Sequence, residues 1–441
     1  MPFSHDGRFH LFYLQDENHH QGLDGLGGHQ WAHASTEDLV HWDHHPMALA
    51  ITMDWEGSIC TGSTFFHEGT YHAFYATRKR DYTQHLGHAV SVNGIDFEKT
   101  SPNPFASPPR GYSVFDYRDP FVFKDETGRF QMLVTAKLED FPLHHGGGCL
   151  MRLSSGDLWR WDVEGPLLFP AGGADYRHVP ECPDYFFWNG WYYLLFGLEL
   201  RTYYRMSRQP FGPWIRPPAD CLTNSMPGVT KTAPFGRDRR IGVGWIGSRQ
   251  GDKDTGSWLW AGHTAFREII QLPDGQLGTR FPDEMTPAVG PALPLAFQPL
   301  TPGVSGRPDS IWLEAAGSQE TAALTGVPRS FRLRCRVRPE PGTYGFGLGL
   351  RGAGSFESFY ALSFSGPRRT VKLERESIDC VDEISNSFDL QVVLKDDIID
   401  VCIAGRRCLV NRLGELQGDR MFFWCESGTV AFDQVEVELV V

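Results

Sequence analysis

The clearest pattern in the chain is a turn glycine that precedes an aromatic residue by two positions and opens an apolar strand. In the first copy, Asp6-Gly7-Arg8-Phe9 leads into His10-Leu11-Phe12-Tyr13. The pattern occurs four times, and its glycines lie 62, 59 and 62 residues apart. Asp-Gly and Asn-Gly pairs at such turns favour the positive φ angles of two-residue hairpins. The four glycines are Gly7, Gly69, Gly128 and Gly190.

A second marker keeps the same phase. In each of these units a serine is followed six or seven residues later by an aromatic residue, as in Ser35 to Trp42. A looser fifth copy begins at Gly236, followed by an alternating apolar strand from Ile241 to Trp245. A period near 60 residues with about four strands per unit is typical of propeller blades. The repeats therefore predict an all-β fold with a five-bladed β-propeller, and they fit an irregular β-sandwich or a solenoid less well.

The pattern changes after about Met285. A proline-rich segment follows, and beyond it short alternating strands recur, such as Ser330 to Val337. Strands of this kind are typical of a compact β-sandwich. We therefore expect a propeller over residues 1–290 with a first blade truncated at its N-terminus, a proline-rich linker over 291–308 and a C-terminal β-sandwich over 309–441.

Charge and composition narrow the candidate partners. The formal net charge of −13 gives no general attraction to nucleic acid or to anionic membrane surfaces, so a neutral small molecule or oligosaccharide fits better. No apolar stretch approaches the ~20 residues that cross a bilayer. Met1-Pro2-Phe3 lacks the features of a secretory signal, which predicts a cytoplasmic protein. Nine cysteines without Cys-x-x-Cys pairs indicate reduced thiols.

The sequence predicts no metal site and no cofactor, and it makes no prediction of oligomeric state. Neighbouring strand residues point to opposite faces, and no His-Glu-x-x-His helix is present. Gly146-Gly147-Gly148 is not followed by the Lys-Ser or Lys-Thr pair of a phosphate loop. Adjacent histidines occur at His19-His20, His44-His45 and His144-His145.

Two acidic residues occupy corresponding places in the third and fourth units. Asp119 and Glu181 each lie nine residues before the turn glycine. Because the innermost strands of a propeller line its central channel, we expect both carboxyl groups in one cavity. Hydrolysis of a glycosidic bond needs such groups, an acid that protonates the leaving oxygen and a carboxylate that attacks the anomeric carbon. The alternatives are a structural Arg118–Asp119 ion pair and an exposed loop acid at Glu181.

These motifs resemble glycoside hydrolase family 32, the invertase, levanase and inulinase group. Arg118-Asp119-Pro120 is similar to the family's Arg-Asp-Pro motif, and Glu181-Cys182-Pro183-Asp184 is similar to its Glu-Cys-Pro-Asp motif. The resemblance implies that Glu181 is the general acid/base, that Asp119 stabilises the transition state and that Arg118 positions it. It further implies a retaining hydrolase that cleaves terminal β-D-fructofuranosyl residues of sucrose or fructans.

Three more residues are candidates for binding the sugar. Trp31 opens a segment, Trp31-Ala32-His33-Ala34-Ser35, that is similar to a first-blade segment of the family and is a candidate stacking platform. Ser63 ends Thr61-Gly62-Ser63, which resembles a Ser-Gly-Ser strand whose hydroxyls could contact sugar. Trp260 belongs to a stretch that resembles the family's fifth blade.

The family's nucleophile is an aspartate in an Asn-Asp-Pro-like motif at the head of the first blade, and no residue of this chain matches it. Asp6 lies at the far end of that strand. We expect the aspartate to precede Met1, because a natural chain rarely begins inside a strand. A protein that has lost hydrolysis and keeps a carbohydrate-binding pocket is the alternative. The segment Leu14-Gln15-Asp16-Glu17-Asn18-His19-His20 replaces the family's Gln-Tyr-x-Pro, and this departure bears on fructose specificity. Another furanosidase, such as one acting on arabinofuranosides, or a phosphorylase with the same fold is a third hypothesis.

Overall fold

The computed structural model describes residues 1–16, 28–141, 146–169 and 179–440. His19, His20, His144 and His145 lie outside these ranges. Within them the regular structure is β-strand apart from three short 3-10 turns, which confirms the expected all-β class. No helix in these ranges is long and apolar enough to cross a membrane.

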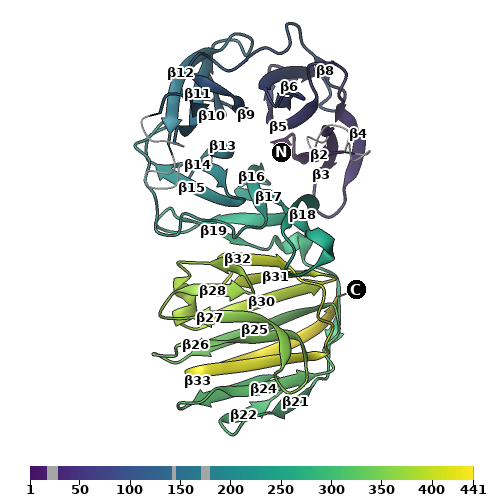
Figure 1. Ribbon diagram of the computed structural model, residues 1–441, viewed down its shortest axis with the longest axis vertical. Helices are drawn as coiled ribbons and strands as arrows, with labels where there is room; N and C mark the ends of the chain where they lie inside the picture. Colours follow the sequence, from purple (N-terminus) through teal and green to yellow (C-terminus); the bar gives the residue numbers. More distant parts are fainter. Residues whose placement is uncertain (17–27, 142–145, 170–178, 441) are drawn as a thin grey trace. The chain divides into compact units, whose positions relative to one another are not determined.

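Five sheets follow one another along the chain and form the five-bladed propeller that the repeats predict (Figure 1). In each sheet the strands pair in chain order. The first two blades are β1 Pro2–His5, β2 Arg8–Gln15, β3 Gln30–Thr36 and β4 Asp43–Leu49, then β5 Ser58–His67, β6 Thr70–Arg78, β7 Gln84–Ser91 and β8 Glu98–Lys99. The next two are β9 Tyr112–Lys124, β10 Phe130–Leu138, β11 Gly148–Ser155 and β12 Asp162–Leu168, then β13 Glu181–Trp188, β14 Trp191–Leu198 and β15 Arg201–Ser207. The fifth is β16 Gly228–Phe235, β17 Arg239–Arg249, β18 Trp258–Gln271 and β19 Leu277–Arg280.

The turn glycines act as the sequence predicts in three blades. Asp6 and Gly7 have φ angles of 47° and 78°, and Asn189 and Gly190 have 45° and 82°. Glu68 and Gly69 repeat the first pair of angles in the second blade. Positive φ at both central residues is the type I′ geometry that matches the twist of a two-residue hairpin. In the third blade, Lys124 pairs with Phe130, so five residues form the loop there.

A polar pair recurs at one place inside the first three blades, between the second and third strands. His10 Nδ1 lies 3.0 Å from His33 Nε2 in the first blade. His72 Nδ1 lies 3.0 Å from His88 Nε2 in the second. In the third blade, Arg152 Nη1 donates to Gln131 Oε1 over 3.1 Å at the same register. The four histidines of the first two blades, which we call the buried histidine pairs, are at most 8% exposed.

The chain divides into two compact units. One comprises residues 1–217 and 229–243, and the other comprises 218–228 and 244–441. The second unit therefore contains β18 and β19 of the fifth blade as well as the C-terminal sandwich. The sandwich strands are β20 Val289–Ala292, β21 Ala296–Pro299, β22 Val304–Arg307, β23 Ser310–Ala315, β24 Glu320–Thr325, β25 Phe331–Pro339, β26 Gly345–Ala353, β27 Ser358–Ser365, β28 Thr370–Leu373, β29 Glu376–Ile378, β30 Phe388–Lys395, β31 Ile398–Ile403, β32 Arg407–Arg412 and β33 Arg420–Val440.

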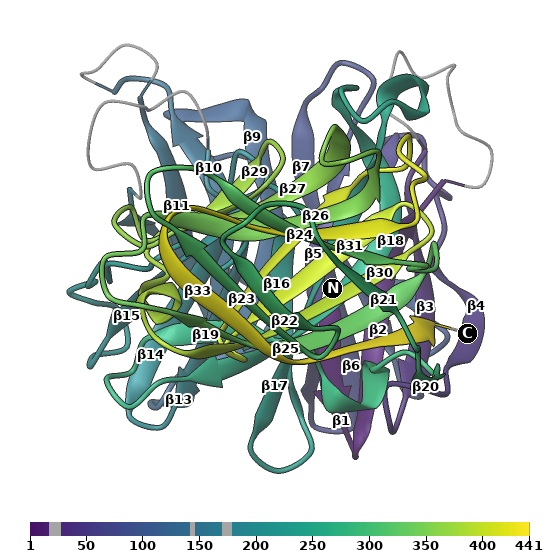
Figure 2. The same ribbon diagram turned by 90° about the horizontal axis from the view of Figure 1, so that it is seen from below.

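The long strand β33 takes part in both layers of the sandwich (Figure 2). Its first part, up to Ser427, pairs with β24 and β26. From Gly428 onward it pairs with β23, β25 and finally β20. Gly428 has a φ of 102°, and a Cβ there would lie 2.6 Å from the Thr343 backbone. The strand therefore changes sheets at a residue whose conformation and surroundings require glycine.

The segment expected to be a linker, residues 291–308, is not free of structure. β20 pairs with β33, β21 pairs with β24, and β22 pairs with β23. These three strands extend the sheets of the sandwich, so this part of the expected organisation is corrected. The exact boundary near residue 290 stays a prediction.

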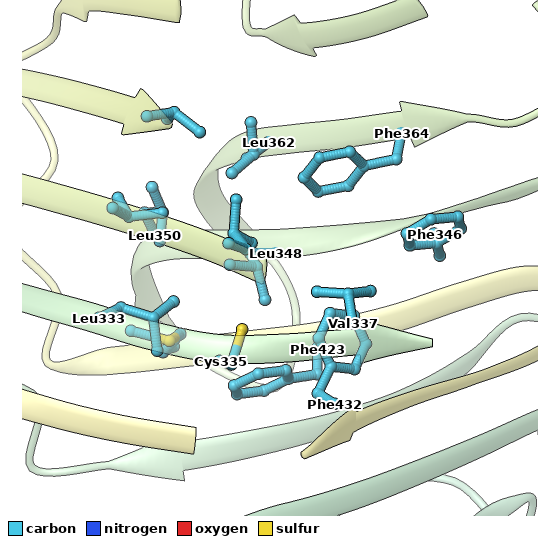
Figure 3. Close-up of a cluster of buried hydrophobic side chains, with 14 of the residues drawn as sticks. Leu333, Cys335, Val337, Phe346, Leu348, Leu350, Leu362, Phe364, Phe423 and Phe432 are labelled. Atoms are coloured by element: carbon cyan, nitrogen blue, oxygen red, sulfur yellow. The ribbon is translucent and has the colours of Figure 1, made fainter. Parts of the chain in front are cut away.

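One apolar cluster fills the sandwich (Figure 3). Along β25, Leu333, Cys335 and Val337 are buried and contribute to this cluster. The arginines between them point the other way, as the period of a strand requires. There Arg334 pairs with Glu436 of β33 over 2.7 Å, directly opposite in register.

Candidate active site

Three neighbouring blades carry the same irregularity in their innermost strand. In β9, Arg118 pairs with Thr135 and Phe121 with Leu133, so Asp119 and Pro120 face a single residue of β10. In β13, the register shifts in the same way between Glu181 and Asp184. In β5, it shifts between Ile59 and Gly62. Two residues opposite one define a β-bulge, which re-aims side chains and commonly lies beside active sites.

The bulges correct the alignment of the two acids. In register, Glu181 corresponds to Arg118, the last paired residue before each bulge. Asp119 corresponds to Cys182, and these two residues share positive φ angles of 58° and 51°. The prediction that Asp119 and Glu181 are equivalent is therefore wrong by one residue. The reason is that the hairpin loop of the third blade is longer, so seven residues separate the bulge from Gly128 and six separate it from Gly190.

The two acids nevertheless meet at one guanidinium group. Arg118 Nη2 donates to Glu181 Oε1 over 2.8 Å, and Arg118 Nε lies 3.7 Å from Asp119 Oδ2. A third carboxylate, that of Asp116, accepts from Arg118 Nη1 over 3.0 Å. The structure thus brings together the three residues that the sequence singled out, from two blades.

Arg118 stays a cation in this setting. Its side chain is 16% exposed, and burial alone would lower its pKa. The nearby carboxylates of Asp119, Glu181 and Asp116 outweigh burial and raise the pKa of Arg118 above its ordinary value. A permanent positive charge therefore lies between the two candidate carboxyl groups.

Asp119 is held rigidly from the neighbouring blade. Its Oδ2 accepts the backbone N–H of Cys182 over 2.9 Å, and the Thr135 hydroxyl lies 3.2 Å away. Its side chain is 4% exposed. An aspartate in the left-handed region costs about 1 kcal/mol or more unless its surroundings stabilise it, and such residues concentrate at functional sites. The interblade hydrogen bond supplies that stabilisation.

Glu181 is more accessible than Asp119. Its side chain is 38% exposed, and the Arg118 guanidinium binds one carboxylate oxygen, Oε1. Glu181 is therefore accessible enough to exchange protons with a ligand. Asp119, which is rigid and buried, can only hold the ligand in place.

Three further residues hold the site in place and were not assigned a role from sequence. Gln84 Oε1 accepts the backbone N–H of Tyr117 over 2.8 Å, which ties β7 to β9. Asp116 lies two residues before Arg118, on the same side of the strand. This two-residue spacing is the sequence signal from which its contact with Arg118 could have been predicted. Beyond the second bulge, the fully buried Asp184 accepts the Thr232 backbone N–H over 2.7 Å and fixes the end of the motif.

Two of the expected sugar-binding residues are structural in the described geometry. Trp31 has no exposed surface, and its indole N–H donates to the Cys60 carbonyl over 2.8 Å. Its ring packs between Phe12 and Tyr75. Ser63 is 5% exposed, and its hydroxyl accepts the Val122 backbone N–H over 3.0 Å, joining β5 to β9. Neither side chain presents a free face to a sugar, so both expectations are corrected.

Trp260 is the remaining candidate, and it lies in the second compact unit, on β18. Its side chain is 51% exposed, and its ring centroid is 6.3 Å from that of Trp245. An exposed indole offers a face on which a sugar could stack. Its role as a sugar platform stays a prediction.

The structural role of Trp31 is testable. Trp31→Phe removes the indole hydrogen bond and leaves a small cavity, so we expect the free energy of unfolding in urea to fall by about 1–3 kcal/mol. Sugar affinity measured by calorimetry should change less than about twofold. Trp159→Phe is the control, because Trp159 is 52% exposed. A large loss of sugar affinity at unchanged stability would show that Trp31 binds the ligand.

No group of three or more His, Cys, Asp or Glu side chains within the described ranges is arranged to hold a metal ion. The absence of a cofactor requirement stays a prediction.

Comparison with known proteins finds a family match for the N-terminal part of the chain. Residues 1–208 match the family described as "Glycosyl hydrolases family 32 N-terminal domain". This part of the chain is a glycoside hydrolase family 32 N-terminal domain. This matched range contains the Arg118, Asp119 and Glu181 cluster described above.

Curated relatives of the chain include two proteins of Escherichia coli. A sucrose-6-phosphate hydrolase is 28% identical over 298 residues, which cover 61% of this chain and 58% of the relative. A raffinose invertase is 29% identical over 329 residues, which cover 67% of this chain and 63% of the relative. The matches thus span about three fifths of the length of these relatives.

Solved structures support the fold. A fructan 1-exohydrolase IIa from Cichorium intybus in complex with 1-kestose superposes with a TM-score of 0.72 at 18% identity, covering 100% of this chain and 94% of that one. A sucrose-6-phosphate hydrolase from Lactobacillus gasseri superposes with a TM-score of 0.69 at 16% identity, covering 99% and 88%. At these identities the likeness shows a shared fold.

Proposed function

We propose that this chain is a retaining glycoside hydrolase that removes terminal β-D-fructofuranosyl residues from sucrose- or fructan-type substrates. The observation that carries the proposal is the Arg118 guanidinium, which lies between Glu181 at 2.8 Å and Asp119 at 3.7 Å. The match to family 32 supports it, because the curated relatives are named as sucrose-6-phosphate hydrolase and raffinose invertase. A neutral small-molecule or oligosaccharide substrate also suits the net charge of −13.

Each residue has a role that its surroundings support. Glu181, the more exposed acid, protonates the leaving oxygen and later removes a proton from the attacking water. Asp119, buried and fixed by Cys182, accepts hydrogen bonds from sugar hydroxyls. Arg118 keeps both carboxyl groups in place. Such a mechanism also needs a carboxylate that attacks the anomeric carbon, and the proposal assigns no residue of this chain to that step.

The test measures fructose release from sucrose, 1-kestose, inulin and levan, with and without added sodium formate. Formate is a small carboxylate that could take the place of the nucleophile and attack the anomeric carbon. The glycosidic bond then breaks, the leaving oxygen takes its proton from Glu181, and water hydrolyses the resulting fructosyl formate to fructose and formate. We expect fructose release, in water alone if the chain supplies its own nucleophile and with saturable dependence on formate if it does not. Failure to bind or cleave any of these sugars would overturn the proposal.

A non-catalytic carbohydrate-binding propeller is the second candidate. One observation favours it: no residue of the chain matches the family's nucleophilic aspartate. This candidate predicts that calorimetry detects binding of sucrose or 1-kestose while no fructose appears under either condition. The two candidates thus differ in product formation and agree on binding.

We also propose that the protein is cytoplasmic. All nine cysteines are free, which supports a reducing environment such as the cytoplasm. Labelling of unpermeabilised and lysed cells tests this placement.

A further inference from the structure

The hairpin of β31 and β32 places two cysteines directly opposite each other. Cys402 pairs with Cys408 in the antiparallel register. The residues beside them, Val401 and Leu409, face the sandwich core, so the two thiols lie on the other side of the sheet. Both cysteines are buried, at 6% and 4% exposure. In the described strands no other two cysteines are cross-strand partners.

The spacing of the pair is close to that of a disulfide. Directly opposed strand residues have Cβ atoms about 4.5–5.5 Å apart. A disulfide needs about 3.5–4.5 Å, so a small approach suffices. The Cys408 thiol donates to the Thr279 carbonyl over 3.4 Å, a weak bond that is easily given up.

A cavity lies close to this pair along β31. It has a volume of about 430 Å³, and its lining includes Arg267, Phe281 and Asp400 but neither cysteine. The charges of Arg267 and Asp400 act on Cys402. Arg267 and Asp400 form an ion pair of 2.7 Å. Asp400 and Cys402 are two residues apart on one face of β31, so a small neutral oxidant that enters the cavity reaches the residues next to Cys402.

The two sulfurs differ in reactivity. The proximity of Cys408, of the Phe281 backbone and of the Arg267 cation lowers the pKa of Cys402, and burial opposes this shift. Burial raises the pKa of Cys408. The thiolate is the reactive form, so Cys402 is the sulfur that attacks first.

We propose that Cys402 and Cys408 are a peroxide-sensitive dithiol that closes into a disulfide. The Cys402 thiolate attacks one oxygen of hydrogen peroxide; a sulfur–oxygen bond forms, the oxygen–oxygen bond breaks, and hydroxide leaves and takes up the thiol proton as water. Cys408 then attacks the sulfenic sulfur; the disulfide forms, the sulfur–oxygen bond breaks and a second water leaves. Two thiols are oxidised, and one peroxide is reduced to two waters.

The disulfide would fix the hairpin where it contacts β19. The Thr279 N–H donates to the Arg406 carbonyl over 2.8 Å, and the Cys408 N–H donates to Thr279 Oγ1 over 3.2 Å. The cross-link therefore locks the strand that carries these contacts. This inference concerns the β31–β32 hairpin and stands independently of the proposed hydrolase activity.

Tryptic mapping of the folded chain tests it. Trypsin cleaves after Lys395, Arg406, Arg407 and Arg412, so the two cysteines fall in separate peptides, residues 396–406 and 408–412, each with a single cysteine. After treatment with hydrogen peroxide and alkylation under denaturing conditions, we expect these peptides to appear covalently joined and to separate on reduction. Free thiols should fall from nine by the two that form the bond.

Two variants sharpen the result. Cys408→Ser should abolish the joined species, whereas Cys380→Ser, which replaces a partly exposed cysteine of the same unit, should leave it unchanged. If Cys408→Ser does not fold, the mapping of the unaltered chain still decides. Oxidation that leaves the two peptides separate, or that joins Cys402 to another cysteine, would overturn the proposal.

Discussion

Replacing Glu181 by glutamine is expected to lower kcat for fructose release from sucrose by about 10²–10⁴-fold, the usual contribution of a general acid/base. The amide keeps the size of the side chain and can still approach the Arg118 guanidinium, but it has no acidic proton to give to the leaving oxygen. The measurement is the initial rate of fructose release, made in formate if the unaltered chain needs it. Sugar binding by calorimetry should change only a fewfold.

A substrate with a better leaving group distinguishes a general-acid role of Glu181 from a structural role. An aryl β-fructofuranoside with a nitrophenolate leaving group needs little protonation, so Glu181→Gln should lose far less activity on it than on sucrose. The matched control is Glu98→Gln, because Glu98 is exposed on β8 at the outer edge of its blade. Equal losses on both substrates, or a loss in the control variant, would contradict the role of Glu181.

Acidification is expected to destabilise the fold before most carboxylates titrate. Burial, aided by nearby charges, lowers the pKa of His10 and His72 to about 4 and that of His33 and His88 to about 3. The unfolded chain binds these protons near pH 6.5, so it holds more protons than the folded chain below that pH. The stability that the neutral pairs contribute is complete above pH 6.5 and is lost as the pH falls toward 4 and 3.

The expected loss is about 1–2 kcal/mol per histidine between pH 7 and pH 5. Urea unfolding at a series of pH values in this range measures it. The third blade suggests the test variant, since its Gln131 and Arg152 form a hydrogen bond at the same register in place of a histidine pair. His72→Gln with His88→Arg should remove about half of this pH dependence, because the His10–His33 pair remains, whereas His44→Gln, at an exposed position on β4, should leave it unchanged. A stability that stays constant from pH 7 to pH 5 in the unaltered chain would contradict the argument.

The propeller could be predicted from sequence because its turns depend on local chemistry. Asp6-Gly7 and Asn189-Gly190 adopt the positive φ angles that their residue types favour. The alignment of the acids could not be predicted in the same way. The turn glycine marks one end of each strand and the bulge marks the other, and the number of residues between them differs between β9 and β13.

The roles of individual residues depended on burial, which local sequence does not reveal. Trp31 lies in a strand that is buried on both faces, so its indole packs in the interior whatever its similarity to a stacking residue. The prediction of a linker in the proline-rich segment failed for a different reason. Pro291 and Pro299 lie in β20 and β21, which each pair with one neighbour, and an edge strand tolerates the missing N–H of proline.

The strand β33 determines where the sandwich can tolerate an inserted residue. Because one continuous backbone is hydrogen-bonded into both layers, a slip of one residue anywhere along it would turn inward-facing side chains outward in both layers at once. Insertions within either half are thus doubly costly, and the change of sheets at Ser427 and Gly428 is where an extra residue would disturb the ladders least.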